Sequence, residues 1–391
     1  MIKKTKKSEF VALTGSQAAA MAMKQIQPDV VPMYPITPAS EIIEEYAQFY
    51  ADGEIQGELV LAESEHSMLS IAVGAAASGA RVMSATDAQG LLYCFEELSI
   101  AAGTRLPIVM NVCNRAISAP ANIHPDHSDS MSAMNQGWLQ IYCETAQEVY
   151  EHNFLAVRLA EKAMLPVMVM QDGFHTSGNV AKVRLFADEK IKKFLGSFKP
   201  VHSLLDVEKP MTFGAIKLMD SYFESKMQED EAVQEALKDF LVIGKELSKI
   251  TGSKYDYFEE YKLKDAEVAI VIMSATAGTV KEVIDKMRTQ GKKVGLLRVK
   301  LFRPFPYDAV QKVLKHLKAI GVMDRTFALG AYPPLYSEIS NAVYNPEKGP
   351  AMQSYVFGIG GRYIFQKDIE KVFNELLNGK IMKGIKYIGV R

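Results

Sequence analysis

Short apolar runs alternate with longer segments of helical character along most of this chain of 391 residues. The runs are rich in Val, Ile, Leu and Met, which is typical of strands that are buried on both faces. Strands that alternate with helices predict a mostly parallel sheet covered by helices on both faces, so the expected fold class is α/β with a doubly wound sheet. The predicted strands are residues 11–13, 30–33, 59–61, 81–84, 107–112, 165–170, 266–273, 293–299, 319–323 and 354–357. The predicted helices are residues 17–25 (with Ser16 as N-cap), 41–50, 65–78, 91–102, 232–250 and 307–319, and one that ends at residue 287.

The alternation stops between residues 179 and 262, where charged clusters replace the apolar runs. We expect no strand there, and so long a stretch favours an arm that packs on another surface over a linker. The chain is too long for one typical core, so two domains are predicted. These are residues 1–255, with an arm from about residue 179, and a smaller α/β domain of residues 256–391.

Charge and cysteine content limit the classes of function. The formal charge of −1 provides no general attraction to nucleic acid or to a membrane surface. The longest apolar run, near residues 67–80, is shorter than the roughly 20 residues that span a bilayer, and we expect a cytoplasmic protein. Cys94, Cys113 and Cys143 lie far apart, which is typical of reduced thiols and unsuited to a [4Fe–4S] cluster.

The segment Tyr34-Pro35-Ile36-Thr37-Pro38 joins a predicted strand to a predicted helix. Each proline fixes its own φ and pushes the preceding residue toward extended geometry. Pro38 also suits the first turn of the following helix, where a missing N–H costs little. The segment predicts a rigid elbow that holds the Thr37 hydroxyl at the carboxyl edge of the sheet, where ligands bind in open α/β folds. The alternative is a stiff loop in which Thr37 only caps the helix.

Glu65 begins a predicted helix that otherwise consists almost entirely of small and apolar residues. An acid in a first helical turn commonly interacts with the helix dipole. The alternative is a buried acid, whose pKa is raised by desolvation and lowered by the helix N-terminus. The pattern alone leaves both interpretations open.

Arg115 follows the predicted strand at residues 107–112 and therefore also belongs to a carboxyl edge. A guanidinium fork at such an edge suits a carboxylate or a phosphate. A structural ion pair within the fold is the alternative.

The polar loop His124-Pro125-Asp126-His127-Ser128-Asp129 contains residue types that bind metals. It lacks the helical histidine spacing and the cysteines of known metal motifs, so we predict a loop ordered by internal hydrogen bonds and no metal on this chain. The chain also lacks GxGxxG and GxxxxGK[ST], which argues against a nucleotide-binding doubly wound module.

Together these segments resemble the α subunits of the 2-oxoacid:ferredoxin oxidoreductase family, most closely those of the pyruvate:ferredoxin oxidoreductases. The resemblance runs in order through nearly the whole chain. In the first domain it is carried by the elbow at 34–38, Glu63-Ser64-Glu65-His66, Gln89-Gly90, Asn114-Arg115-Ala116, Asp126-His127-Ser128-Asp129, Gly137-Trp138 and Asp172-Gly173-Phe174. In the second it is carried by Gly295-Leu296-Leu297-Arg298, Leu301-Phe302-Arg303-Pro304-Phe305-Pro306 and Gly358-Ile359-Gly360-Gly361-Arg362.

The resemblance implies a subunit of a thiamine diphosphate enzyme. Such an enzyme oxidatively and reversibly decarboxylates pyruvate to acetyl-CoA and CO₂, with ferredoxin as electron acceptor and coenzyme A as co-substrate. The first domain would be of the pyrimidine-binding type, and the second would be similar to the transketolase C-terminal domain.

The resemblance also implies roles for individual residues. Glu65 matches the glutamate that hydrogen-bonds the cofactor's aminopyrimidine and favours its imino tautomer, and Gln89 and Gly90 match cofactor-binding positions. Thr37 and Arg115 match the residues that hold the carboxylate and carbonyl of the substrate. A buried acid that acts on a ring nitrogen and a fixed guanidinium for an anionic substrate agree with this physically.

Two absences imply partner subunits. The chain has no Gly-Asp-Gly followed by Asn for a Mg²⁺-diphosphate site and no cluster cysteines. By resemblance, a β subunit supplies the Mg²⁺ and diphosphate site, and γ and δ ferredoxin-like subunits carry [4Fe–4S] clusters. We expect a dimer of such hetero-oligomers, with an active site between chains and no activity in this subunit alone.

Some positions depart from the family pattern and bear on the substrate. Thr86-Asp87-Ala88 stands where small uncharged residues are usual, and Ala133-Met134-Asn135-Gln136 lacks an arginine often found there. Relatives that use oxalate carry an arginine at the position of Thr37, so the neutral threonine favours a monocarboxylate such as pyruvate. The remaining alternatives are a 2-oxoisovalerate (branched-chain) enzyme and a non-catalytic scaffold subunit of an electron-transfer complex.

Overall fold

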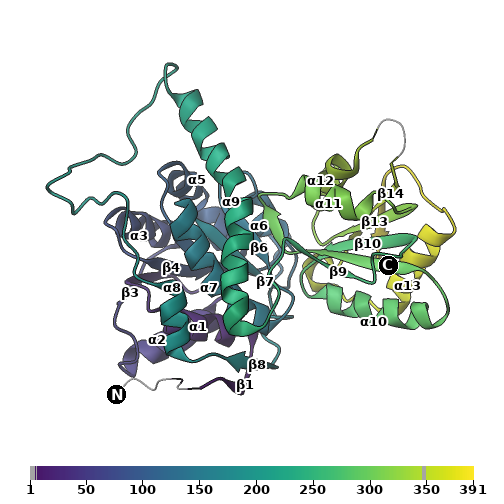
Figure 1. Cartoon of the computed structure of the whole chain (residues 1–391), viewed down its shortest axis with the longest axis horizontal. Coiled ribbons are helices and arrows are strands. Elements are labelled where there is room, and N and C mark those ends of the chain that lie inside the picture. Colours follow the sequence, from purple (N-terminus) through teal and green to yellow (C-terminus); the bar gives the residue numbers. More distant parts are fainter. Residues whose placement is uncertain (1–4, 6, 346–348) are drawn as a thin grey trace.

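The computed structural model of the chain describes residues 5, 7–345 and 349–391 (Figure 1). The strands are β1 (Glu9–Leu13), β2 (Val30–Met33), β3 (Glu58–Leu61), β4 (Val82–Thr86), β5 (Ile108–Asn114), β6 (Leu139–Tyr142), β7 (Val167–Asp172), β8 (Ala181–Leu185), β9 (Phe258–Tyr261), β10 (Val268–Met273), β11 (Val294–Val299), β12 (Leu301–Arg303), β13 (Ala319–Asp324), β14 (Ala351–Phe357) and β15 (Ile385–Ile388). The helices are α1 (Gly15–Ile26), α2 (Ser40–Ala51), α3 (Glu65–Ala77), α4 (Ala88–Tyr93), α5 (Phe95–Gly103), α6 (Ser128–Ser132), α7 (Ala146–Ala163), α8 (Asp188–Leu195), α9 (Tyr222–Thr251), α10 (Thr276–Thr289), α11 (Tyr307–Leu314), α12 (Pro334–Val343), the 3₁₀ turn η1 (Ile359–Gly361) and α13 (Gln366–Leu377).

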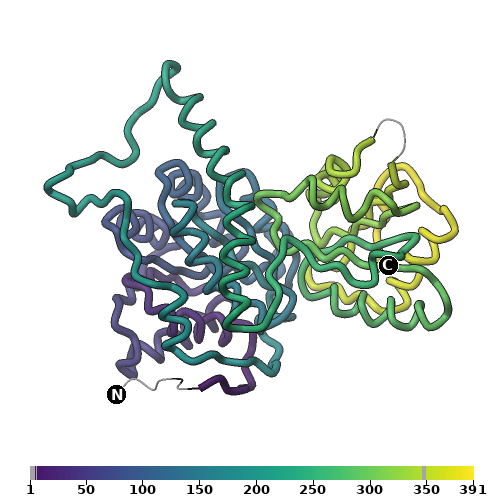
Figure 2. The backbone as a smooth tube through the Cα atoms, in the orientation of Figure 1, coloured from purple at the N-terminus to yellow at the C-terminus, as the bar shows by residue number. Residues whose placement is uncertain are grey.

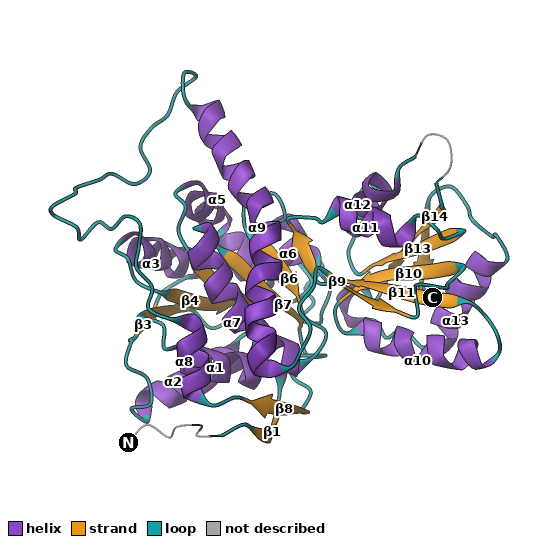
Figure 3. Cartoon of the chain, viewed as in Figure 1, coloured by secondary structure: helices purple, strands orange, loops and turns teal. Residues whose placement is uncertain are grey.

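The larger sheet has seven strands in the order β12-β6-β7-β5-β4-β2-β3, and all neighbours are parallel except β12 and β6. Its central strands β4 and β5 are buried at every residue, because helices cover both faces (Figure 3). Val109 and Cys113 of β5 pack in a core with α1 and α7, whereas Met110 and Val112 point to the opposite face and pack with α3 and α5. This confirms the predicted doubly wound α/β fold.

The second sheet has six strands in the order β15-β14-β13-β10-β11-β9, with β9 antiparallel at its edge. On one face α10 and α13 pack through side chains such as Ile284 and Phe373, and on the other α11 and α12 pack through Val310 and Ile339. The predicted second α/β unit is therefore confirmed as a second sandwiched, mostly parallel sheet.

Each sheet contains a point at which the chain reverses its direction of winding. In the larger sheet β3 lies on one side of β2 and β4 on the other, and in the second sheet β11 and β13 flank β10 in the same way. Loops that leave the carboxyl ends of such a strand pair diverge, and open α/β sheets bind ligands in the crevice between them.

The prediction that residues 179–262 contain no strand is wrong. β8 pairs antiparallel with β1, where Val11 lies opposite Val183, and β9 pairs with β11. The strand β8 is half exposed, with only Val183 and Leu185 buried, so it alternates instead of forming the continuous apolar run that marks the central strands. The helix predicted at 232–250 is longer and spans α9.

Local predictions also need correction. Thr14, not Ser16, caps α1: its side chain accepts a hydrogen bond from the Gln17 N–H in a capping box. The helix predicted at 91–102 is divided at Cys94 into α4 and α5. The prediction lacked β6 and α7. The long helix α7 buries the polar residues Glu151, His152 and Asn153, which in the sequence resemble a solvent-exposed face.

Residues 196–221 form a long loop that first contacts the end of α3, where the Leu204 N–H donates to the Ala77 carbonyl at 2.9 Å. The loop then leaves the body of the molecule and returns into the projecting first turns of α9 (Figure 2). Its packing on another surface stays a prediction, as do the domain limits 1–255 and 256–391. The strand β12 follows the proposed boundary but pairs with β6 of the larger sheet. No helix in the described part of the chain is long and apolar enough to cross a membrane.

Candidate active site

Four polar side chains follow the carboxyl ends of neighbouring parallel strands in the larger sheet. Thr37 follows β2, Glu65 follows β3, Asp87 follows β4 and Arg115 follows β5. The strands β2 and β4 share only the pairing of Val30 with Val82, so their carboxyl halves separate. The side chains therefore surround the winding reversal of the sheet, the place where an α/β fold binds ligands.

Arg115 joins this group together. Its Nη1 donates a 2.8 Å hydrogen bond to the Thr37 backbone carbonyl and lies 3.5 Å from Asp87 Oδ1. Its Nε donates at 3.3 Å to the Asn122 carbonyl. The guanidinium therefore contacts a carboxyl group within the fold, as the structural alternative from the sequence expected, and it also reaches the exposed elbow at Thr37.

Asp129 holds the backbone of Arg115 in place. It is fully buried, and its Oδ2 accepts hydrogen bonds from the backbone N–H groups of Ala88 (3.0 Å) and Arg115 (2.9 Å). Its Oδ1 accepts from Asn114 Nδ2 at 2.8 Å. One carboxylate thus ties together the loops that follow β4 and β5. Ala88 has a φ of 39°, an unusual conformation for a residue with a side chain, which the bond to Asp129 helps to hold.

Glu65 is the first residue of α3 and is only 7% exposed. In the described part of the chain, no hydrogen bond or ion pair engages its carboxylate. A Cβ added to Gly90 would come within 2.7 Å of Glu65 Oε1 and 2.6 Å of Thr86 Oγ1, so only glycine fits beside this acid. Both sequence interpretations hold: Glu65 lies in a first helical turn and is also buried.

Asp87 is the polar centre of the group. Its Oδ2 accepts a 3.0 Å hydrogen bond from the Ala39 N–H, which fixes the start of the helix after the elbow. Burial raises the pKa of Asp87 to about 8, with further raising by the nearby carboxylates of Asp129 and Glu65 and lowering by Arg115. Asp87 is therefore mostly protonated at neutral pH, which leaves the charge of Arg115 largely unopposed.

Several buried polar atoms at this edge have no hydrogen-bond partner within the described chain. They are Thr86 Oγ1, Asp87 Oδ1, Gln89 Oε1 and Asn114 Oδ1. Buried polar atoms are usually satisfied, so a cluster of unsatisfied ones beside a free buried carboxylate favours a ligand with several donors. An aminopyrimidine ring fits this set, because its amino group would donate to such acceptors and one of its ring nitrogens would share a proton with the Glu65 carboxyl.

The loop at 124–129 is ordered partly as predicted, since Asp126 Oδ1 accepts hydrogen bonds from the Ser128 N–H (3.0 Å) and Oγ (2.5 Å). His127 of this loop has another role, which the sequence did not indicate. His127 Nε2 lies 2.7 Å from Asp172 Oδ1 at the end of β7, and Asp172 Oδ2 lies 3.1 Å from Arg325 Nη1 at the end of β13. These buried groups connect the two large sheets.

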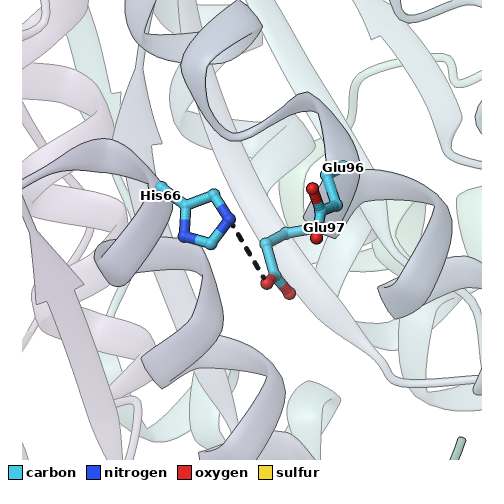
Figure 4. A group of neighbouring side chains, drawn as sticks. All are labelled: His66, Glu96 and Glu97. Atoms are coloured by element: carbon cyan, nitrogen blue, oxygen red, sulfur yellow. Dashed lines mark ion pairs between the residues drawn. The ribbon is translucent and has the colours of Figure 1, made fainter.

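His66, Glu96 and Glu97 form a second polar cluster (Figure 4). Potential metal-ligand atoms of His66, Glu96 and Glu97 lie within 4.8 Å of one another, and His66 Nε2 is 3.8 Å from Glu97 Oε1. Glu97 also accepts a 3.0 Å hydrogen bond from Ser70 Oγ. An ion pair and a hydrogen bond account for this cluster, and we assign no metal to it; the absence of a metal from the chain stays a prediction.

The structure therefore gathers all three predicted catalytic residues, Glu65, Thr37 and Arg115, with the predicted cofactor positions Gln89 and Gly90. The sequence analysis missed the roles of Asp129 and Asn114 and treated Asp87 only as a departure from a pattern. The position of Asp87, directly after a fully buried strand at the winding reversal, is a signal that could have found it.

Comparison with known families agrees with this geometry. The family described as "Pyruvate flavodoxin/ferredoxin oxidoreductase, thiamine diP-bdg" matches residues 21–240, and "Pyruvate:ferredoxin oxidoreductase core domain II" matches residues 266–369. "Pyruvate synthase subunit PorA" of Thermotoga maritima is 47% identical over 98% of both chains, and that of Methanocaldococcus jannaschii is 40% identical over 94% of this chain and 95% of the relative.

Two further relatives are informative. "Ketoisovalerate oxidoreductase subunit VorA" of Pyrococcus horikoshii is 37% identical over 96% of both chains. The solved "2-oxoglutarate:ferredoxin oxidoreductase from Magnetococcus marinus with 2-oxoglutarate, coenzyme A and succinyl-CoA bound" has a TM-score of 0.72 at 19% identity. The superposition covers 95% of this chain and 66% of that one, and it shows a shared fold.

Proposed function

Because the chain belongs to the pyruvate flavodoxin/ferredoxin oxidoreductase family, we propose that it is the α subunit of a pyruvate synthase, the enzyme that converts pyruvate, coenzyme A and oxidised ferredoxin to acetyl-CoA, CO₂, reduced ferredoxin and protons. The observation that carries the proposal is the gathering of Glu65, Thr37 and Arg115 on one sheet edge in a chain that matches such subunits from end to end. Membership of a multisubunit oxidoreductase implies partner chains.

Thiamine diphosphate, when bound, supplies the carbanion chemistry that cleaves 2-oxoacids. On this chain Glu65, Gln89 and the glycine at position 90 would hold its aminopyrimidine side, since they combine a free buried carboxylate, an unsatisfied amide oxygen and a close backbone approach. With the cofactor bound, the buried Glu65 carboxyl would share a proton with a ring nitrogen of the aminopyrimidine.

Arg115 and Thr37 bind the substrate. The guanidinium neutralises and orients the carboxylate of the 2-oxoacid, and the Thr37 hydroxyl, exposed on the elbow, donates to an oxygen of the same molecule. A threonine offers no charge for a second carboxylate, which supports a monocarboxylate substrate. Pyruvate is favoured over 2-oxoisovalerate because two pyruvate synthase relatives, at 47% and 40%, are more identical to this chain than the ketoisovalerate relatives, at 37% and 38%.

The remaining parts belong to partner subunits in this proposal. A β subunit provides Mg²⁺ and the diphosphate site, γ and δ ferredoxin-like subunits carry the [4Fe–4S] clusters to ferredoxin, and two such assemblies pair. The three cysteines of this chain support that division, since all are buried and separate. Copurification of the chain with its partners, cofactor analysis, and ferredoxin reduction with pyruvate or 2-oxoisovalerate test the proposal. Full turnover by an assembly without this chain would contradict it.

Arg115→Lys in the assembled enzyme is expected to raise the KM for pyruvate about tenfold or more. A lysine ammonium cannot bridge a carboxylate in two places, and a lost charge-assisted hydrogen bond is worth about 1.5–3 kcal/mol. Steady-state kinetics measure the change. Arg105→Lys is the matched control, since Arg105 also donates to backbone carbonyls, of Met164 and Ala163, at a remote site. An unchanged KM for Arg115→Lys would remove this residue from the substrate site.

Asp87→Asn is expected to alter the pH profile and to leave neutral activity nearly unchanged. In the native enzyme Asp87 ionises as the pH rises through about 8, and its carboxylate then competes with pyruvate for Arg115. The KM of the native enzyme should rise above that pH, and the KM of the variant should stay flat, because asparagine keeps the acceptor for the Ala39 N–H without a charge. KM measured from pH 6.5 to 9.5 tests this. Parallel profiles for both proteins would show that Asp87 does not control the charge at Arg115.

A further inference from the structure

A large cavity lies at the winding reversal of the second sheet, where the proposed reaction uses no residue. We call it the β10/β13 pocket. Its volume is about 890 Å³, and its walls come from the carboxyl ends of β10, β13 and β14 and from loops of the larger sheet that contain Asn122 and Phe174. The position is the one at which doubly wound sheets bind ligands, and it corresponds to the edge that carries Thr37 and Arg115 in the first sheet.

The pocket favours a negatively charged ligand. No acidic side chain lines it among the described residues, whereas the basic residues Arg325, Arg362, Arg391, His124 and His175 do. Arg325 is already paired with buried Asp172, so the available side-chain charges are those of the exposed Arg362 and Arg391. Arg362 donates a 3.4 Å hydrogen bond to the Gly389 carbonyl. Thr276, the first residue of the 14-residue helix α10, also lines the pocket, and the preceding Ala275 N–H donates to Asp172 Oδ2 at 3.2 Å. The positive partial charge of this helix end is therefore shared between Asp172 and the pocket.

Aromatic rings form the other wall. Tyr363 is 72% exposed and stacks on His175 with an interplanar angle of 15°, and Phe174 contacts the ring of His124 at 5.5 Å between centroids. Burial and the charge of Arg325 lower the pKa of His175, so its ring is neutral. Flat, uncharged and partly exposed rings favour a flat aromatic ligand group.

We propose that the β10/β13 pocket binds a nucleotide, with its phosphates against Arg362 and the start of α10 and its base against Tyr363. A guanidinium, a helix N-terminus and an exposed aromatic face within one cavity match the anionic and aromatic parts of that ligand class. The source is either a free nucleotide or the nucleotide part of coenzyme A. The GxGxxG and GxxxxGK[ST] motifs of other nucleotide-binding proteins are not needed, because Arg362 would bind the phosphates in place of the backbone N–H groups of a glycine-rich loop.

The pocket is connected to the proposed substrate site. Asn122 lines the pocket and donates through Nδ2 to the Gly360 carbonyl at 3.2 Å, and its own carbonyl accepts the bond from Arg115 Nε. A Cβ on Gly360 would lie 2.4 Å from Asn122 Nδ2, so this contact depends on the glycine. A nucleotide that rearranges Asn122 therefore changes the position of the arginine, and this part of the inference rests on the proposed function.

Equilibrium dialysis of ATP with the assembled enzyme, saturated with thiamine diphosphate, tests the binding. We expect a saturable component that Arg362→Glu weakens about tenfold or more and that Tyr363→Ala also weakens. Lys312→Glu, which makes the same charge change at an exposed position outside the pocket, should leave that component unchanged. Pyrophosphate, which has no base, should bind equally to native enzyme and Tyr363→Ala. If coenzyme A displaces ATP, the natural ligand of the pocket is the nucleotide part of coenzyme A. If coenzyme A does not displace ATP, the natural ligand is a free nucleotide.

The inference would be overturned if the native enzyme showed no saturable ATP binding, or if Arg362→Glu did not weaken that binding. Dialysis needs no turnover, so this result is distinguishable from failure of the proposed reaction, which would appear as no pyruvate-dependent ferredoxin reduction. In the kinetic arm, ATP should change the KM for pyruvate in the native enzyme and not in Arg362→Glu. A KM that ATP does not change in the native enzyme would overturn the connection through Asn122.

Discussion

Glu65→Gln in the assembled enzyme is expected to lower kcat by about 10²–10⁴-fold, the range in which a positioned acid or base contributes to catalysis. The carboxylate is 7% exposed and has no partner in the described part of the chain, so it is poised for a group outside the chain. Glutamine keeps the size of the side chain but cannot share a proton with a ring nitrogen. Ferredoxin reduction under saturating pyruvate and thiamine diphosphate measures the loss.

The control for this prediction is Glu63→Gln. Glu63 lies two positions earlier but is exposed and accepts a 2.6 Å hydrogen bond from Ser67 Oγ. It should retain normal turnover. Because Glu65 contributes no internal hydrogen bond, its variant should also assemble and melt like the native complex. Normal turnover of Glu65→Gln would favour the scaffold interpretation, in which the subunit only organises electron-transfer partners.

The sequence was sufficient to predict the sheet edge, because the relevant side chains follow continuous apolar strands. Parallel strands bring their carboxyl ends to one side, so Thr37, Glu65 and Arg115 needed only the strand assignments to be placed near one another. The strand β8 was missed because it has no continuous apolar run. It buries only one face, and its alternation of buried and exposed residues is short.

Side-chain contacts between distant segments were beyond prediction. Asp87 and Asp129 are 42 positions apart, and nothing in the local sequence of either shows that both border Arg115. The glycines at 358–361 were recognised only as a motif. The structure gives the reason for two of them: a Cβ on Gly360 or Gly361 would lie 2.4 Å from Asn122 Nδ2 or from His124 Cβ, so they permit close packing between the loops of the two large sheets.

Asp172→Asn is expected to destabilise the assembled protein by about 3–5 kcal/mol, the cost of breaking a buried ion pair by removing one partner. Asp172 is fully buried between His127 and Arg325, and its Oδ2 also accepts from the Ala275 N–H at 3.2 Å, so its charge joins β7 of the larger sheet to β10 and β13 of the second. Asparagine would leave the buried Arg325 without its counter-charge. Thermal melting of the complex measures the loss.

The same carboxylate predicts a pH dependence. Burial disfavours its ionisation, but Arg325 and His127 outweigh that effect and hold the pKa of Asp172 well below its usual range. A depressed pKa gives stability that is complete above the unfolded value of about 3.9 and is lost as the pH falls toward the folded value. The native protein should therefore lose stability relative to Asp172→Asn within this acidic window. Asp265→Asn removes the partner of Arg288 at an exposed position and should leave the melting temperature nearly unchanged at neutral pH. Equal melting shifts for Asp172→Asn and Asp265→Asn would show that the buried group does not hold the two sheets together.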